Sequence, residues 1–374
     1  MAIESVSPTD ARRRQGRGGL LVDVREAPER ASGMAEGALG VPLGVLLESP
    51  AEALPDQARD ILLICEGGKR SMEAAAGLLQ AGYRRVASVE GGTRAWRAAA
   101  LPLAYPAGDP DFHDRYSRHL RLPEVGEAGQ RRLLAARVAI VGAGGLGSPT
   151  AYYLAAAGVG TLAIADDDVV ERSNLQRQIL HAEARIGTPK VESARVALQA
   201  LNPGLRVEPL AERITSANVE RFLEGADVVV DGGDNLPMRY LLNDACVKLS
   251  KPLVYGAVDR FDGQASVFDA GRHRGVLPCY RCLFPEPPPP EFAPNCSDTG
   301  VLGVLPGVIG LLQATEVIKL LLGLGEPLAG RLLRFDALAM RFRETRVPAD
   351  PDCPVCAAGR EFPGYIDYQQ FCAG

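Results

Sequence analysis

Short apolar runs alternate with helix-like segments along the first hundred residues. Strands are expected over residues 20–24, 61–65 and 86–89, because each is a short run of mostly aliphatic side chains. Residues 71–83 (SMEAAAGLLQAGY) are rich in alanine and place apolar side chains at helical spacing. Strands that alternate with helices predict βα units on a largely parallel sheet.

The alternation stops near Pro102 and resumes after PAGDP (106–110), whose proline, glycine and aspartate residues are typical of a linker. We therefore expect two domains, residues 1–106 and 107–374. The second domain is expected to begin with two helices, over residues 112–122 and 127–135.

A second series of apolar runs follows these helices. A glycine-rich turn and a helix over 146–157 separate the first two of its strands. The strands are expected over residues 138–141, 161–165, 206–210, 227–231 and 253–258. This order predicts a doubly wound, Rossmann-like α/β domain.

Beyond residue 263 the pattern favours antiparallel strands, over residues 264–268 and 331–335. Between them lies PEPPPPEFAPN (285–295), in which four consecutive prolines favour an extended loop. The predicted fold class is thus α/β: a small domain, then a doubly wound domain with an antiparallel C-terminal part.

The composition is that of an ordinary folded protein. Apolar residues make up 47% of the 374 residues and charged residues 23%, which excludes wholesale disorder. The formal net charge of −5 disfavours a nucleic-acid partner. The most apolar stretch, 301–324, contains Pro306, Glu316 and Lys319, so no membrane span is expected.

The N-terminus lacks the apolar core of a signal peptide, so we expect a cytoplasmic protein. Eight cysteines in such a protein indicate chemistry other than a disulfide framework.

The first candidate site is Cys65, in the segment CEGGKRS between an expected strand and an expected helix. Glycines allow several N–H groups to point at the sulfur, and Lys69 and Arg70 add positive charge. Both effects favour the thiolate, which is the nucleophilic form, and would stabilise a persulfide equally. An inert buried cysteine at the end of a strand is the alternative.

The motifs LVDVREAPER, VPL, CEGGKRS and EGGTRAWRAAALPL make residues 1–105 resemble a rhodanese, a sulfurtransferase domain. The resemblance implies that Cys65 carries a persulfide, which an upstream donor would supply. Residues 33–43 (GMAEGALGVPL) depart from the stretch that rhodaneses often have there, Gly-His-Ile-Pro-Gly.

The second candidate site starts with GAGGLG (142–147), a GxGxxG turn between a strand and a helix. Asp166 follows the next strand, where a ribose-binding carboxylate is expected. Asn174, Arg177 and Lys190 then add hydrogen-bond donors and positive charge suited to a triphosphate. Taken singly, Arg177 or Lys190 could equally be a solvated surface charge.

A carboxylate in DGGDN (231–235), at the end of a later strand, could hold Mg²⁺.

The string GAGGLGS, DDDVVERSNLQRQ, GTPKVESA, DGGDN makes residues 112–357 resemble the MoeB/ThiF family, bacterial relatives of ubiquitin-activating enzymes. The resemblance implies a homodimer that uses ATP to adenylate the C-terminal carboxylate of a ubiquitin-like sulfur carrier, releasing pyrophosphate. Arg177, Lys190 and Asp234 would act directly in this step.

By position, the resemblance implies roles for twelve residues at the nucleotide. Arg118 would reach the neighbouring subunit's site, and Asp166 would bind the ribose. The full set is Gly142, Gly144, Gly145, Gly147, Asp166, Asp168, Asn174, Arg177, Lys190, Asp234, Asn235 and Arg118.

Two CxxC pairs form the third candidate site, Cys279 with Cys282 and Cys353 with Cys356. Four thiolates in two such pairs match a closed tetrahedral Zn²⁺ site with a structural role. Redox chemistry at each pair is the alternative. Relatives in the MoeB/ThiF family carry a similar zinc site.

Cys296 follows the proline-rich loop and aligns with a cysteine that some relatives use in sulfur transfer or thioester formation. A bystander thiol is the equal alternative. Of the remaining cysteines, Cys246 is expected in the core and Cys372 without a role.

Together these features suggest a fused enzyme that adenylates a MoaD-like or ThiS-like carrier and supplies sulfur from Cys65. Molybdenum cofactor, thiamine, thiolated-tRNA and cysteine pathways share this activation step. The alternatives are a nicotinamide-dependent oxidoreductase on the same glycine motif, a non-catalytic scaffold for a sulfur carrier, and a cyanide-detoxifying sulfurtransferase.

Overall fold

The computed structural model describes residues 3–105, 109–287 and 300–373. The chain folds as two compact units, Met1–Gln130 and Arg131–Gly374. The predicted domain boundary at residue 107 falls within the first of these units and stays a prediction. Each unit is described by itself below.

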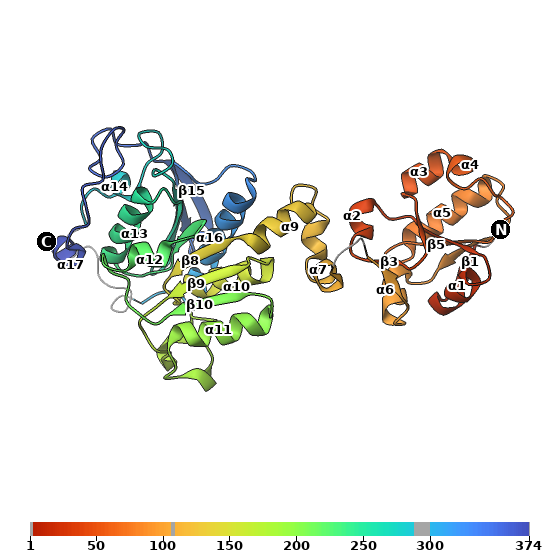
Figure 1. Ribbon diagram of the computed structural model, residues 1–374, viewed down its shortest axis with the longest axis horizontal. Coiled ribbons are helices and arrows are strands. Elements are labelled where there is room, and N and C mark those ends of the chain that lie inside the picture. The colour runs from red at the N-terminus through yellow and green to blue at the C-terminus, as the bar shows by residue number, and fades with distance from the viewer. Residues whose placement is uncertain (1–2, 106–108, 288–299, 374) are drawn as a thin grey trace. The chain divides into compact units, whose positions relative to one another are not determined.

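A five-stranded parallel sheet forms the centre of the first unit (Figure 1). Its strands, in spatial order, are β1 (Glu4–Val6), β6 (Val86–Val89), β5 (Ile61–Ile64), β2 (Leu20–Asp23) and β4 (Leu39–Gly40). Successive β5 side chains enter two different apolar clusters, Leu63 one and Leu62 the other, because strand side chains alternate between faces. Burial on both faces explains the unbroken apolar runs of the sequence.

Helices pack against both clusters of this sheet. On one side, α5 (Lys69–Gln80) buries Ala74, Ala75 and Leu78, and on the other α6 (Gly92–Ala98) buries Trp96. α5 begins directly after the loop that follows Cys65, so this loop joins a buried strand to a helix N-terminus.

The smaller elements of this unit complete its surface. They are α1 (Pro8–Gln15), α2 (Ala27–Arg30), α3 (Leu43–Glu48), α4 (Pro50–Ala53) and the strand pair β3 (Met34–Ala35) and β7 (Leu103–Ala104). The single helix expected over 112–122 is instead two short helices, α7 (Pro110–Arg115) and α8 (Ser117–Leu120). They meet at Tyr116, whose backbone (φ −100°, ψ 13°) departs from helical geometry.

An eight-stranded mixed sheet forms the centre of the second unit (Figure 1). The strands from β10 to β12 run parallel, and those from β12 to β15 run antiparallel. In spatial order they are β10 (Arg206–Leu210), β9 (Thr161–Ala165), β8 (Arg137–Val141), β11 (Val228–Asp231), β12 (Leu253–Asp259), β13 (Asp262–Phe268), β14 (Arg331–Asp336) and β15 (Arg341–Arg346). The predicted fold class is confirmed, antiparallel part included.

Five helices precede, connect or follow the parallel strands along the chain. They are α9 (Gly126–Ala135), α10 (Gly147–Ala157), α11 (Lys190–Leu201), α12 (Val219–Leu223) and α13 (Leu236–Lys248). The short helices η1 (Arg172–Asn174), η2 (Glu183–Arg185), α14 (Tyr280–Leu283) and α17 (Tyr368–Ala373) lie in the connections and at the C-terminal end.

The most apolar helix is α16 (Leu305–Leu322), which packs on α10, β12 and β13. Its length and composition alone would suit a membrane span, but half of it is buried inside the protein. This burial accounts for its apolar sequence without a membrane.

Candidate functional site

A cavity of about 470 Å³ lies where β8, β9 and β11 end, at the edge of the sheet where doubly wound folds bind ligands. Nine of the predicted nucleotide residues line it. They are Gly142, Gly144, Gly145, Asp166, Asp168, Arg177, Lys190, Asp234 and Asn235. Residues from segments far apart in the sequence therefore meet at one place.

The glycine-rich turn at this cavity is tightly packed. Gly142 has a φ of 96°, and a Cβ there would lie 2.6 Å from the carbonyl oxygen of Gly232. A Cβ on Gly147 would lie 1.9 Å from the carbonyl oxygen of Gly142. Only glycine fits at these two positions, which brings the turn against the DGGDN segment. Gly147 packs against the Gly142 carbonyl but does not line the cavity.

Asp166 directly follows β9, and Lys190 is the first residue of α11. The Asp166 carboxylate accepts hydrogen bonds from the N–H groups of Ala143 (2.8 Å) and Asp168 (2.9 Å). Burial raises the pKa of Asp166, although the positive charge of Lys190 opposes this. The Lys190 Nζ lies 2.7 Å from the Asp168 carboxylate, and its side chain is 7% exposed. A bound phosphate would compete with Asp168 for this ammonium group.

Arg177 and Asn174 both belong to the RSNLQRQ segment but lie differently. Arg177 lines the cavity and donates to the carbonyl of Ser173 at 3.2 Å. Asn174 is absent from the lining, and its side-chain oxygen accepts from the Glu171 N–H in a capping box for η1. Arg118 lies in α8 of the first unit. The nucleotide roles of Asn174 and Arg118 stay predictions.

Two lining residues, Gln178 and Arg239, had not been predicted from the sequence, and the neighbouring Asp231 lies just outside the lining. Asp231 is completely buried at the end of β11, and burial raises its pKa to about 6. Arg239 of α13 lies 3.5 Å from the Asp231 carboxylate, and its guanidinium lies over the Tyr255 ring. Gln178 is 5% exposed, and its buried side-chain oxygen has no hydrogen-bond partner among the residues that the structure describes. Asp231 belongs to DGGDN, Gln178 belongs to RSNLQRQ, and Arg239 follows DGGDN shortly after in the sequence. The motifs alone do not distinguish residues that line the cavity from residues that support it.

The second site surrounds Cys65, which is 1% exposed at the end of β5. Its sulfur accepts a hydrogen bond from the Gly68 N–H at 3.2 Å and lies 3.5 Å from the Ser71 hydroxyl oxygen. Burial raises the pKa of the Cys65 thiol, but hydrogen bonds from Ser71, Gly67 and Gly68 outweigh burial and leave the pKa below its ordinary value. The loop thus favours the thiolate.

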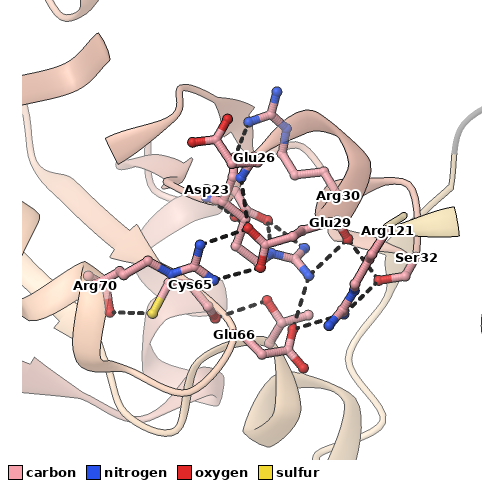
Figure 2. A network of polar contacts seen from close by, with 12 residues as sticks. Asp23, Glu26, Glu29, Arg30, Ser32, Cys65, Glu66, Arg70 and Arg121 are labelled. Atoms are coloured by element: carbon pink, nitrogen blue, oxygen red, sulfur yellow. Dashed lines mark hydrogen bonds and ion pairs between the residues drawn. The ribbon is translucent and has the colours of Figure 1, made fainter. Parts of the chain in front are cut away.

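Carboxylates bind several of the arginines near this loop. Figure 2 shows Arg70 bound to Glu29 beside Cys65, with two contacts of 2.7 Å. It also shows Arg121, which lies 3.7 Å from the Glu66 carboxylate. Hydrogen bonds therefore lower the pKa of the Cys65 thiol more directly than the positive charges of Lys69 and Arg70, which the sequence analysis had also invoked.

The third site is a cluster of four cysteines. The sulfur atoms of Cys279, Cys282, Cys353 and Cys356 all lie within 4.8 Å of one another. The sulfur–sulfur distance is 3.6 Å for Cys279 and Cys353, and 3.4 Å for Cys282 and Cys356. A tetrahedral zinc site with Zn–S bonds of about 2.3 Å requires sulfur atoms about 3.8 Å apart. The donor set and its spacing therefore fit a tetrahedral metal.

A buried ion pair connects this cluster to α13. Arg281, between Cys279 and Cys282, donates to both oxygens of Asp244 at 2.9 and 2.8 Å. Tyr368 of α17 also donates to Asp244, at 2.8 Å. The N-terminal end of α13 is capped by the side chain of Asn235, which lines the cavity. One helix thus joins the nucleotide cavity to the cysteine cluster.

The remaining cysteines differ in their surroundings. Cys246 is 2% exposed in the core cluster, as expected. Cys372 is half-buried on α17 and packs against the same cluster. Cys296 lies outside the described residues, so its role stays a prediction.

Comparison with known proteins gives two family matches. Residues 116–355 match the ThiF family, and residues 7–99 match the rhodanese-like domain. The Haloferax volcanii SAMP-activating enzyme E1 is 54% identical over 261 residues, which are 70% of this chain and 95% of that protein. The Thermus thermophilus sulfur carrier protein adenylyltransferase is 52% identical over 260 residues, 69% of this chain and 96% of that protein.

Two further relatives widen the comparison. A Drosophila yakuba protein named adenylyltransferase and sulfurtransferase MOCS3 is 51% identical over 259 residues, 69% of this chain and 56% of its own length. The crystal structure of E. coli MccB with ATP has a TM-score of 0.56 at 23% identity, over 67% of this chain and 75% of that chain, and shows the shared fold. The protein therefore belongs to the ThiF family and carries a rhodanese-like domain at its N-terminal end.

Proposed function

We propose that this protein adenylates the C-terminal carboxylate of a ubiquitin-like sulfur carrier, MoaD-like or ThiS-like, and then delivers sulfur to it from Cys65. One observation carries the proposal: the glycine turn, Asp166, Arg177, Lys190 and Asp234 line a single cavity. The names of the Haloferax and Thermus relatives support the activation step, and the name of the Drosophila relative supports both adenylation and sulfur transfer.

Adenylation joins two anions, so reducing charge repulsion is the main task of the site. The carrier carboxylate attacks the α-phosphorus of ATP, and the bond to pyrophosphate breaks. Arg177 and Lys190 would bind the phosphates, and Asp166 would accept hydrogen bonds from the ribose. Asp234, exposed at the cavity, would hold Mg²⁺, which neutralises charge on the leaving pyrophosphate.

Sulfur transfer would begin from a persulfide on Cys65, supplied by an upstream persulfide donor. The terminal sulfur attacks the acyl carbon of the acyl-adenylate, AMP leaves, and an acyl disulfide links the carrier to Cys65. Two thiols then supply two electrons: the first cleaves the S–S bond and releases the thiocarboxylate, and the second frees Cys65. Cys296 is a candidate for the first thiol, and a reducing cytoplasm suits this step.

Zn²⁺ would be bound by Cys279, Cys282, Cys353 and Cys356 and would supply a structural crosslink, because four protein ligands leave no open position. We also propose a homodimer in which Arg118 of one subunit reaches the nucleotide of the other. Both proposals extend the family assignment to particular residues.

The experiment combines two measurements on the full chain with each candidate carrier. ATP–pyrophosphate exchange that depends on the carrier demonstrates adenylation and excludes a scaffold. Mass spectrometry of the carrier after addition of ATP, Mg²⁺ and a persulfide donor detects replacement of one oxygen by sulfur. No exchange with any carrier, together with binding of a nicotinamide cofactor, would replace this proposal with the oxidoreductase alternative.

A further inference from the structure

A buried histidine lies next to the glycine-rich turn and has no part in the chemistry described above. His181 is 7% exposed and follows η1 and the RSNLQRQ segment. Its Nε2 lies 2.9 Å from the carbonyl oxygen of Ala143, and its Nδ1 lies 2.9 Å from the hydroxyl oxygen of Ser193 on α11. Both ring nitrogens thus have partners.

These contacts define which nitrogen carries the proton. A carbonyl oxygen only accepts, so Nε2 must be the donor to Ala143. In the neutral ring Nδ1 then accepts from the Ser193 hydroxyl. Arg185 donates to the same hydroxyl oxygen at 2.9 Å, which leaves the hydroxyl proton free to point at His181. The donors form one directed chain from Arg185 through Ser193 and His181 to Ala143.

The surroundings favour the neutral ring. Burial lowers the pKa of His181 below its ordinary value, although the hydrogen bond to Ala143 opposes this effect. The positive charges of Lys190 on α11 and Arg185 on η2 act in the same direction as burial.

The residue that this chain reaches is the one between Gly142 and Gly144. The N–H of Ala143 donates to Asp166 at 2.8 Å, while its carbonyl accepts from His181 and lies 3.3 Å from the Ser148 hydroxyl. Both peptide groups of Ala143 are therefore held by side chains from other elements. Gly142 and Gly144, on either side, line the cavity.

We propose that His181 is a positioning residue for nucleotide binding: the neutral ring holds the Ala143 carbonyl and so keeps the 142–145 turn and Asp166 in their binding arrangement. The inference rests on the proposed function of this cavity as an ATP site. A turn fixed before the nucleotide arrives saves the ordering that a free turn would require on binding. Without His181, the Ala143 carbonyl keeps only the longer contact to Ser148 among the described residues.

The test measures binding of a non-hydrolysable ATP analogue to the full chain by calorimetry, without any carrier, alongside the melting temperature of each variant. His181→Leu removes the donor and should weaken binding about tenfold, the equivalent of one hydrogen bond. His181→Gln can place an amide N–H near the position of Nε2 and should restore most of the affinity. Ser193→Ala should weaken binding less, and should add nothing in the His181→Leu background.

His273→Gln is the control, because this histidine is half exposed and distant in sequence. Equal affinities of the wild type and His181→Leu would overturn the inference. So would losses in His181→Leu and His181→Gln that follow the melting temperature alone, since a purely structural role predicts that result. A wild type that binds no ATP analogue would instead refute the proposed function itself.

Discussion

The Arg70 guanidinium donates two hydrogen bonds of 2.7 Å to Glu29, one to each carboxylate oxygen. The hydrogen bond from Arg70 is the main reason that the pKa of Glu29 falls to about 2, so the carboxylate stays ionised at any physiological pH. The arginine that follows the sulfur loop is thus largely neutralised, and Cys65 depends on hydrogen bonds for its reactivity.

Replacing Glu29 with glutamine should therefore lower the pKa of Cys65 further, because Arg70 would keep an uncompensated charge near the sulfur. A lower pKa means more thiolate, and hence faster alkylation, at acidic pH. The measurement is the rate of iodoacetamide labelling of Cys65 against pH, read by peptide mass spectrometry. Glu48→Gln makes the same charge change on α3 and should leave the profile unchanged. An unshifted profile in Glu29→Gln would mean that Arg70 does not act on the sulfur.

Arg177→Ala and Lys190→Ala should each reduce carrier-dependent pyrophosphate exchange by about a hundredfold or more, because each removes a positive charge that faces the reacting phosphates. Arg172→Ala is the matched control: it lies in the same segment, but its side chain is 79% exposed and pairs with Glu183. Exchange rates in Arg177→Ala and Lys190→Ala that match the control would contradict the assigned phosphate site.

Cys65→Ala should keep pyrophosphate exchange near the wild-type rate and lose thiocarboxylate formation, because the thiol acts only after the adenylate has formed. Exchange and carrier mass would be measured on the same samples. Cys372→Ala, which removes a thiol from α17, should retain both activities. If a folded Cys65→Ala protein lost exchange as well, the two reactions would not be separable in the way proposed.

Cys353→Ser should abolish binding of one Zn²⁺ per chain and lower the melting temperature, because three thiolates hold the ion less tightly than four. Metal content by mass spectrometry and thermal unfolding give the two readouts. Cys246→Ala, in the core but outside the cluster, should keep its zinc. The zinc site would be wrong if the wild-type protein contained no metal and Cys353→Ser had the same melting temperature as the wild type.

Sequence patterns predicted the central parallel strands, because a strand buried on both faces requires an unbroken apolar run. They missed the parallel edge strands β1 and β4, which are partly exposed. They did not predict β15, whose six residues are all exposed and mostly charged. This strand exists because it pairs with β14 through backbone hydrogen bonds, and such pairing leaves little trace in side-chain pattern. The break at Tyr116 was missed for a similar reason, since no proline or glycine marks it.

For the nucleotide site, nine of the twelve residues that the family resemblance implied line one cavity. Asn174 illustrates the limit, because a side chain that could bind phosphate is also a good helix cap and serves as one here. His181 illustrates the opposite case. Its partners, Ala143 and Ser193, are distant in sequence, so only the folded chain reveals them.

The helix α13 has one end at the nucleotide cavity and holds the Arg281 ion pair of the cysteine cluster towards the other. We therefore expect that loss of the proposed Zn²⁺, by metal depletion or by oxidation of the cysteines, would disturb the end of α13 that lies at the cavity. Adenylation would then fall although the nucleotide residues and Cys65 are chemically unchanged. Adding Zn²⁺ would restore it after metal depletion, whereas oxidised cysteines would first need a thiol reductant.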